Sequence, residues 1–257
     1  MMTDVPNAPE DDGRLLSVRI ADDIRRAVLD GSMLPGTRVG QEWLAAKFGA
    51  SRIPVREALR QLQDEGLVIL APNRGAWIAD VTSQDSIEVY KIREALEPLA
   101  MAESVPHLSD EDISALEATV ARLERVDSVQ EYIPLDRAFH LKAYSRAPLP
   151  HLLRTIERYW NSTQHFRRWF VKDSLAKAGL PFSDPQHLML MEMIRARDAE
   201  GAASIVRLHI RRTRLLIEKM APPPKERQKS RRQAPTNAAD SRTTLDADAS
   251  PHDPFTA

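Results

Sequence analysis

The fold of this chain is decided by Ser51-Arg52-Ile53-Pro54-Val55-Arg56-Glu57-Ala58-Leu59-Arg60, which divides into two faces when it is wound as a helix. Its three arginines recur at every fourth position on one side, whereas Val55, Leu59 and Leu62 fall on the other. Pro54 lies in the first turn, where its missing N–H is not needed, and Ser51 is suited to cap the helix start. The stretch therefore predicts a helix that packs by one face and presents positive charge on the other.

A shorter amphipathic segment precedes this helix. Residues 41–48 carry Trp43, Leu44 and Phe48, and Gly49 follows them as a residue suited to the left-handed end of a helix. Two short helices joined by a tight turn at residues 49–51 predict a helix-turn-helix, whose second helix enters the major groove of DNA.

The flanking segments predict the rest of a small domain. A first helix with apolar residues at helical spacing ends at Gly31. After Gly66, residues 67–70 and 76–79 are typical of two strands joined by a turn, with Arg74 at the tip of the turn. The pattern predicts a winged helix-turn-helix with a β-hairpin wing over residues 14–82, preceded by a disordered tail at 1–13.

These motifs resemble those of the GntR family of bacterial transcription regulators. The resemblance rests on Leu34-Pro35-Gly36-x-Arg38, on the 51–59 core, on Glu65-Gly66-Leu67 and on Arg74-Gly75. It implies that Arg52 and Arg56 contact base edges, while Thr37 or Arg38 and the wing tip contact the backbone or the minor groove. The expected DNA-binding residues are Arg38, Ser51, Arg52, Pro54, Arg56, Arg60, Arg74 and Gly75.

Two alternatives limit this interpretation of the arginines. A row of arginines on a helix is usually a solvated face, and arginines on DNA can also hold phosphates without reading bases. Some relatives carry an arginine at the position of Glu42, and an acid there argues against a DNA contact from that position.

Composition fits a cytoplasmic regulator. The 257 residues leave room for two domains and a tail, and the net charge of −1 argues against a protein that coats nucleic acid without specificity. The absence of cysteine excludes disulfides, thiolate catalysis and Cys-ligated zinc fingers, so any metal must have nitrogen and oxygen ligands. No membrane-spanning run and no signal peptide is evident, so we expect no membrane association.

After residue 82 the pattern changes to long helices with almost no strand signal. Helices are expected at 83–105, from 109 through 123, and at 130–145, 150–170, 183–197 and 199–220, with a loop at 172–181. Residues 221–257 have the composition of a disordered tail. The fold class is therefore mainly α, with an all-α antiparallel helical bundle over 83–220 following the winged helix.

Four residues of this bundle suit a metal site. Asp136 and His140 share a helix face at i, i+4, while His187 and His209 lie on consecutive helices that can return to the same height as a hairpin. One carboxylate and three imidazoles suit Zn²⁺, and also Ni²⁺ or Mn²⁺, with coordination positions left open. Each residue alone has an ordinary structural explanation, whereas the joint spacing is much harder to obtain by chance.

This half of the chain resembles the FCD effector domain found in the FadR branch of the GntR family. In that domain an Asp-x-x-x-His pair and two later histidines bind metal, which implies Asp136, His140, His187 and His209 as ligands here. Two departures concern the shape of the pocket: Gln186 stands where relatives often have Glu, and residues 172–181 differ from the usual connection. We expect His107, His151, His165 and His252 to be structural.

Arg93 interrupts an apolar stripe, so its charge is expected to point inward and to need an anionic partner. The partner is either Glu97, at i, i+4, or the carboxylate of an effector that also reaches the metal, as the family resemblance implies. Arg158 and Asn161 are expected to line the same cavity.

The sequence as a whole predicts a homodimeric transcription factor that binds a short inverted-repeat operator on double-stranded DNA. A small carboxylate effector at the metal site is expected to control its operator affinity, with repression as the expected mode. The alternatives are a metal-dependent hydrolase or lyase that uses the Asp/His site, and a DNA-binding protein whose metal is purely structural.

Overall fold

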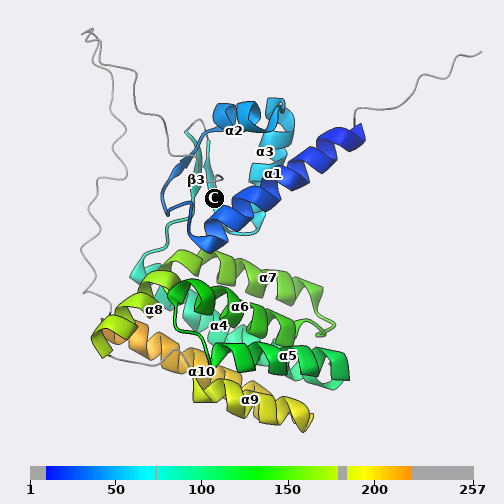
Figure 1. Ribbon diagram of the computed structural model, residues 1–257, viewed down its shortest axis with the longest axis vertical. Coiled ribbons are helices and arrows are strands. Elements are labelled where there is room, and N and C mark those ends of the chain that lie inside the picture. Colours follow the sequence, from blue (N-terminus) through cyan, green and yellow to red (C-terminus); the bar gives the residue numbers. More distant parts are fainter. Residues whose placement is uncertain (1–9, 73, 179–183, 221–257) are drawn as a thin grey trace, which may run out of the picture.

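The computed structural model describes residues 10–72, 74–178 and 184–220, which form two domains stacked on one another (Figure 1). The first domain contains α1 (Glu10–Asp30), β1 (Arg38–Val39), α2 (Gln41–Phe48), α3 (Arg52–Asp64), β2 (Val68–Ala71) and β3 (Gly75–Ile78). The predicted N-terminal tail of residues 1–13 is too long, because α1 already begins at Glu10. Residues 1–9 and the predicted tail at 221–257 lie outside the described residues.

The helix-turn-helix forms where the sequence predicts it. Gly49 ends α2 with a left-handed φ of 58°, a conformation that glycine adopts without steric cost. Ser51 is the extended residue before α3, although its side chain makes no capping hydrogen bond. The tight turn between the two helices therefore depends on backbone conformation more than on side-chain capping.

The two faces of α3 separate as predicted. Val55, Leu59 and Leu62 are fully buried, and each such side chain contributes about 1.5–3 kcal/mol when it leaves water. Arg56 and Arg60 are exposed on the opposite side. The hydrophobic face fixes α3 to the domain and leaves its charged face open to solvent.

The wing is part of a three-stranded antiparallel sheet with the order β1-β3-β2. The hairpin pairs Ile69 with Trp77, and β1 adds Arg38 opposite the same Trp77. The predicted hairpin is confirmed. Strand β1 was not predicted from the sequence, because two residues carry no readable alternation of polar and apolar side chains.

The second domain is helical in its described residues. It contains α4 (Ser83–Ser104), the 3-10 turn η1 (Val105–His107), α5 (Asp110–Leu123), α6 (Val129–Tyr144), α7 (Pro150–Ser162), α8 (Gln164–Ala178), α9 (Pro185–Arg195) and α10 (Ala199–Met220). Thr82 with Asp85 and Ser109 with Asp112 form complete capping boxes at the starts of α4 and α5. Each box satisfies backbone N–H groups that have no partner within the helix.

Two predicted boundaries in this domain are wrong. The expected helix at 150–170 is divided into α7 and α8 at Thr163, whose φ of −96° and ψ of 0° lie outside the helical region. The Thr163 hydroxyl donates to the carbonyl of Tyr159, and local bonds of this kind compete with regular helix geometry. Residues 172–178, expected as a loop, continue α8 to Ala178.

Each domain has its own hydrophobic core. The winged-helix core gathers around Ile20, Leu59 and Ile78, whereas the helical core includes Phe139 and Trp160. In Figure 1 the winged helix rests on the side of the bundle formed by α6, α7 and α8, while α9 and α10 lie farthest from it. None of the described helices is long and apolar enough to cross a membrane.

Candidate functional site

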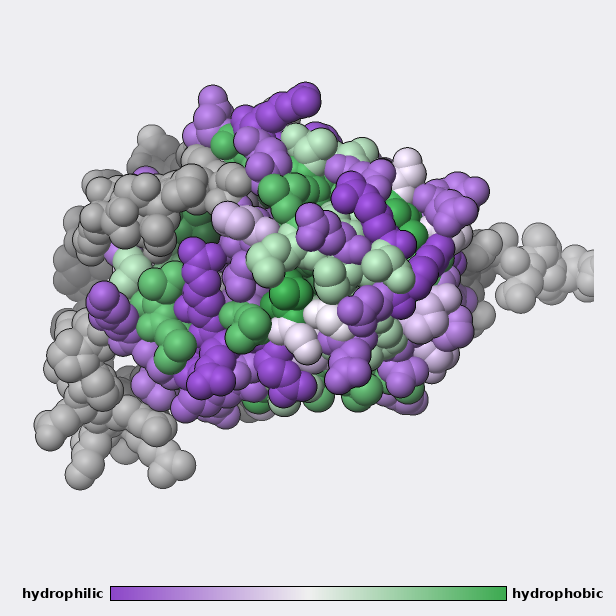
Figure 2. Space-filling view, turned by 90° about the horizontal axis from the view of Figure 1, so that it is seen from below, coloured by the Kyte–Doolittle hydropathy of each residue, from purple (hydrophilic) through white to green (hydrophobic). Residues whose placement is uncertain are grey.

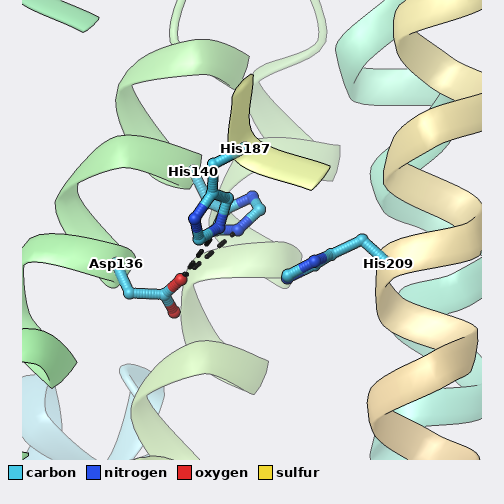
Figure 3. A group of neighbouring side chains, drawn as sticks. All are labelled: Asp136, His140, His187 and His209. Atoms are coloured by element: carbon cyan, nitrogen blue, oxygen red, sulfur yellow. Dashed lines mark ion pairs between the residues drawn. The ribbon is translucent and has the colours of Figure 1, made fainter. Parts of the chain in front are cut away.

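The four predicted metal ligands come together inside the helical domain. Asp136 and His140 project from α6, His187 from α9 and His209 from α10 (Figure 3). Each offers one ligand atom, and these atoms all lie within 4.8 Å of one another. The first three residues are at most 2% exposed, so the cluster forms a buried polar centre.

The facing atoms of the cluster lack hydrogen-bond partners. Asp136 Oδ1 lies 3.2 Å from His187 Nε2 and 3.7 Å from His140 Nε2. All three atoms are buried without a hydrogen bond. Because buried polar atoms are normally satisfied, a cation that accepts nitrogen and oxygen ligands fits this arrangement.

A second charge reaches Asp136 from α8. Arg167 Nη2 donates to Asp136 Oδ2, so one carboxylate oxygen is paired while the other faces the histidines. Burial by itself would raise the pKa of Asp136, but Arg167 and the two nearest histidines hold it well below its usual value. Arg167 was not predicted from the sequence as a partner of Asp136, because the 31 positions between the two residues give no periodic signal.

His140 is oriented by a chain of buried side chains. The Tyr144 hydroxyl donates to Glu97 Oε2 at 2.8 Å, and His140 Nδ1 lies 3.1 Å from the same hydroxyl. Because the Tyr144 hydroxyl donates its hydrogen bond to Glu97, it can only accept from His140, whose Nδ1 therefore carries the proton. The unprotonated Nε2 of His140 then faces the cluster with its lone pair. Burial lowers the pKa of His140 well below its usual value, against the opposing effect of Asp136. The ring is therefore neutral, as a metal ligand must be.

His209 has a carboxylate of its own. Its Nδ1 lies 3.4 Å from Asp184 Oδ2, and Arg212 contacts the same carboxylate at 3.1 Å. Burial alone would raise the pKa of Asp184, but His209 and the backbone N–H of Gln186 hold it well below its usual value. Asp184 also caps α9 and so connects the helix carrying His187 to the helix carrying His209.

Of the two partners considered for Arg93 from sequence, the structure shows Glu97. Its Nε donates to Glu97 Oε1 at 2.5 Å, which confirms the pair within α4. Its guanidinium also stacks over Trp160, with the central carbon 4.0 Å from the ring centroid. Arg167 stacks over Trp160 in the same way at 4.1 Å. The Nη1 atoms of both arginines are buried without a partner, so both can donate to a further acceptor.

Asn161 and Arg158 lie elsewhere. Asn161 Nδ2 donates to the carbonyl of Glu65 at 3.2 Å, and its Oδ1 accepts from Arg137 at 2.8 Å. Arg158 packs against Gly66. Both ends of the Asn161 amide are thus used at the boundary between the domains, not in an effector cavity as expected.

Most of the expected DNA-binding residues are exposed, and Pro54 is buried. Arg56 and Arg60 are exposed on α3, and Arg38 and Arg74 are exposed on the sheet and at the wing tip. Ser51 is exposed and Gly75, with φ of 114°, closes the wing turn. Pro54 is buried, so it acts by starting α3 and not by touching DNA.

Arg52 has a partner that the sequence analysis did not predict. Its Nη2 donates to Glu42 Oε1 at 2.6 Å, and both side chains are mostly exposed. Glu42 therefore occupies part of the Arg52 guanidinium and limits the directions in which it can point. Glu42, which was not expected to contact DNA, thus affects the helix-turn-helix through its contact with Arg52.

Comparison with known proteins agrees with this architecture. The model of the gntR family of bacterial regulatory proteins matches residues 16–78, and the FCD domain model matches residues 88–212. An HTH-type regulator from the TAR-I ttuE-ttuC' intergenic region of Agrobacterium vitis is 37% identical over 128 residues, which cover 46% of this chain and 72% of the relative. The HTH-type regulator YdhC of Bacillus subtilis is 29% identical to this chain over an alignment that covers 72% of this chain and 84% of YdhC.

A solved structure supports the fold. Escherichia coli McbR/YncC superposes with a TM-score of 0.65 at 23% identity, over 79% of this chain and 97% of that chain. GntR regulators bind DNA and FCD domains bind small-molecule effectors, while the relatives are regulators and not enzymes. The chain therefore belongs to the GntR family of bacterial regulatory proteins and is a DNA-binding transcriptional regulator whose second domain is an FCD domain.

Proposed function

We propose that this regulator is an operator-binding repressor whose DNA affinity is set by a small carboxylate held beside a divalent transition metal. The observation that carries the proposal is that Asp136 Oδ1, His140 Nε2 and His187 Nε2 are buried without hydrogen-bond partners, and that a ligand atom of His209 completes the group within 4.8 Å. One oxygen and three nitrogen donors suit zinc best, with nickel or manganese as alternatives. When bound, such an ion supplies a positive centre for an anionic ligand.

Two arginines support the carboxylate part of the proposal. Arg93 and Arg167 are at most 6% exposed, both stack on Trp160, and both keep an unpaired Nη1. Their charges are balanced by Glu97 and Asp136. A divalent ion would then leave the centre with excess positive charge, which a buried site compensates by taking up an anion. A small mono- or dicarboxylate, such as a hydroxy acid or a sugar acid, meets this need.

Two copies of the chain are needed for the proposed operator. Two recognition helices about 34–36 Å apart read the two halves of an inverted repeat. Apolar side chains reach the surface on the face opposite the winged helix, interrupted by hydrophilic ones (Figure 2). Leu208 and Leu215, seven residues apart on α10, are exposed by 53% and 49%, and Leu99 on α4 by 48%. Such exposed leucines are available for a homodimer contact.

The competing proposal is a metal with a purely structural role. Both proposals require metal, so metal analysis of protein purified without chelator comes first, with about one ion per chain expected. A panel of small acids is then tested for thermal stabilisation and for release of a promoter fragment. Acids that stabilise the metal-loaded chain and change its operator affinity support the effector role. If metal binds and no acid changes either property, the metal is structural and the effector proposal is wrong.

A further inference from the structure

The winged helix contacts the helical domain through the ends of two of its helices. Leu29 lies at the C-terminal end of α1, and Glu65 is the residue that ends α3. A glycine in the left-handed region lies just beyond each of them: Gly31, two residues after Leu29, has a φ of 88°, and Gly66, directly after Glu65, has a φ of 77°. The carbonyl groups at a helix end lack partners within the helix and carry partial negative charge. Both ends therefore present acceptors to the helical domain.

Arg168 of α8 holds the end of α1. Its Nη2 donates to the carbonyl of Leu29 at 2.6 Å, and its charge complements the negative end of the helix. A Cβ placed on Gly31 would lie 3.0 Å from Arg168 Nε, so the guanidinium lies directly against this glycine. The contact joins residues 139 positions apart in the sequence.

Asn161 of α7 holds the end of α3, the recognition helix. Its Nδ2 donates to the carbonyl of Glu65. A Cβ on Gly66 would lie 3.1 Å from the backbone oxygen of Arg158, so α7 also approaches this helix end closely. The Glu65 carboxylate accepts from Arg25 at 2.7 and 2.6 Å, which joins α3 to α1. The two held helix ends therefore form one connected unit.

The same two contacts lead back to the metal ligands. Arg167, which pairs with Asp136, directly precedes Arg168 in α8. Arg137, which donates to Asn161 Oδ1, directly follows Asp136 in α6. Neighbouring residues on a helix point about 100° apart, so each helix places one residue in the site and the next at the domain boundary. A movement of α6 at Asp136 therefore displaces Arg137, and a movement of α8 at Arg167 displaces Arg168.

We propose that Asn161 and Arg168 dock the winged helix onto the helical domain by its two helix ends, and that this dock transmits changes at Asp136 to α3. The docking half of the inference stands on contacts between described residues alone. The transmitting half rests on the metal site of the proposed function. A ligand acts through the dock by favouring one of two orientations of the winged helix over the other.

The test measures the orientation directly. The chain has no cysteine, so Glu57→Cys on α3 and Glu103→Cys on α4 allow two spin labels without further changes. Distances within one chain are measured by pulsed electron resonance after dilution with unlabelled protein. The dock variants are Asn161→Ala and Arg168→Ala, alone and combined. Arg154→Ala is the matched control, because Arg154 is an exposed arginine of α7 that bonds to His151 of its own helix.

The docking half is judged in metal-free protein. We expect a narrow distance distribution in the wild type and in Arg154→Ala, and a broader or shifted one in each dock variant, most of all in the combined variant. The two dock residues lie on different helices, so if one single variant fails to fold, the other single variant still tests the dock. A distribution as narrow as that of the wild type in the folded dock variants would overturn the dock.

The transmitting half is judged by adding zinc. We expect zinc to shift the wild-type distribution and to leave that of the combined variant unchanged, while both proteins bind zinc with similar affinity. Zinc that binds without moving the wild-type distribution overturns transmission by metal. A chain that takes up no zinc contradicts the proposed metal site, and the dock is then decided by the metal-free distances alone.

Discussion

Arg167 and Asp136 form an ion pair inside the helical domain, and this pair leaves one oxygen of the Asp136 carboxylate facing His187. A buried carboxylate without compensation would be protonated, and a protonated carboxylate is a poor metal ligand. Arg167 thus keeps Asp136 charged in the absence of metal. The arginine prepares the ligand without occupying the atom that the metal needs.

Removal of Arg167 should therefore lower the free energy of unfolding most when no metal is bound. Arg167→Met leaves Asp136 uncompensated, and we expect a loss of about 3–5 kcal/mol in the free energy of unfolding of the metal-free chain. A bound ion restores the positive charge, so zinc-loaded protein should lose less. Urea unfolding in chelator and in zinc measures both values, with the exposed Arg207→Met of α10 as control. Equal losses in both conditions would mean that Arg167 serves packing alone.

Arg93 requires a paired substitution, because it neutralises Glu97 in the core. Arg93→Met alone should destabilise the chain strongly by leaving a buried carboxylate. Arg93→Met combined with Glu97→Gln removes both charges, and we expect stability close to that of the wild type. If Arg93 holds the effector, the double variant should still bind metal but lose stabilisation by the acid. A double variant that responds like the wild type would place the carboxylate elsewhere.

Arg56 is expected to read bases, since it is exposed on the charged face of α3. Arg56→Ala should weaken binding to the specific operator by about 1–3 kcal/mol and leave non-specific binding nearly unchanged. Competition gel shifts with operator and random DNA measure the two affinities. A parallel fall of both would identify Arg56 as a phosphate contact.

Glu42 should restrain Arg52 and weaken its attraction to DNA. In Glu42→Ala the Arg52 guanidinium loses its partner, and one negative charge leaves the DNA-facing surface. We expect stronger non-specific binding and a steeper dependence of affinity on salt, because more positive charge is available to phosphates. Titrations at several salt concentrations test this, and Glu42→Gln separates the charge from the hydrogen bond. An unchanged salt slope would show that the pair does not limit DNA binding.

His165 should make stability depend on pH. Burial and the nearby Arg168 lower the pKa of His165 to about 4, against partial opposition from Asp80. The unfolded chain binds a proton below its own pKa of about 6.5, whereas the folded chain does not until about pH 4. The contribution of His165 to stability is thus complete above pH 6.5 and is lost as pH falls toward 4. Urea unfolding between pH 7.5 and 4.5 should show a shallower decline in His165→Asn than in the wild type.

The sequence by itself determined the local features of this protein. The two faces of α3, the left-handed Gly49, and the capping boxes at Thr82 and Ser109 follow from residues at most a few positions apart. Helix periodicity and capping are short-range effects, so they can be read along the chain. The spacing of one aspartate and three histidines also pointed to the four residues that the structure brings together.

Only the tertiary structure decided which polar groups meet. The contacts of Asp136 with Arg167, of Tyr144 with Glu97, and of Asn161 with Glu65 join residues 31, 47 and 96 positions apart. Such contacts depend on how helices pack, and the packing angle leaves no periodic trace in the sequence of either helix. Asn161, for example, was expected beside the effector, but its side chain contacts the end of the recognition helix. The contacts of Asn161 are set by the way the two domains pack against each other, which the sequence of α7 alone does not show.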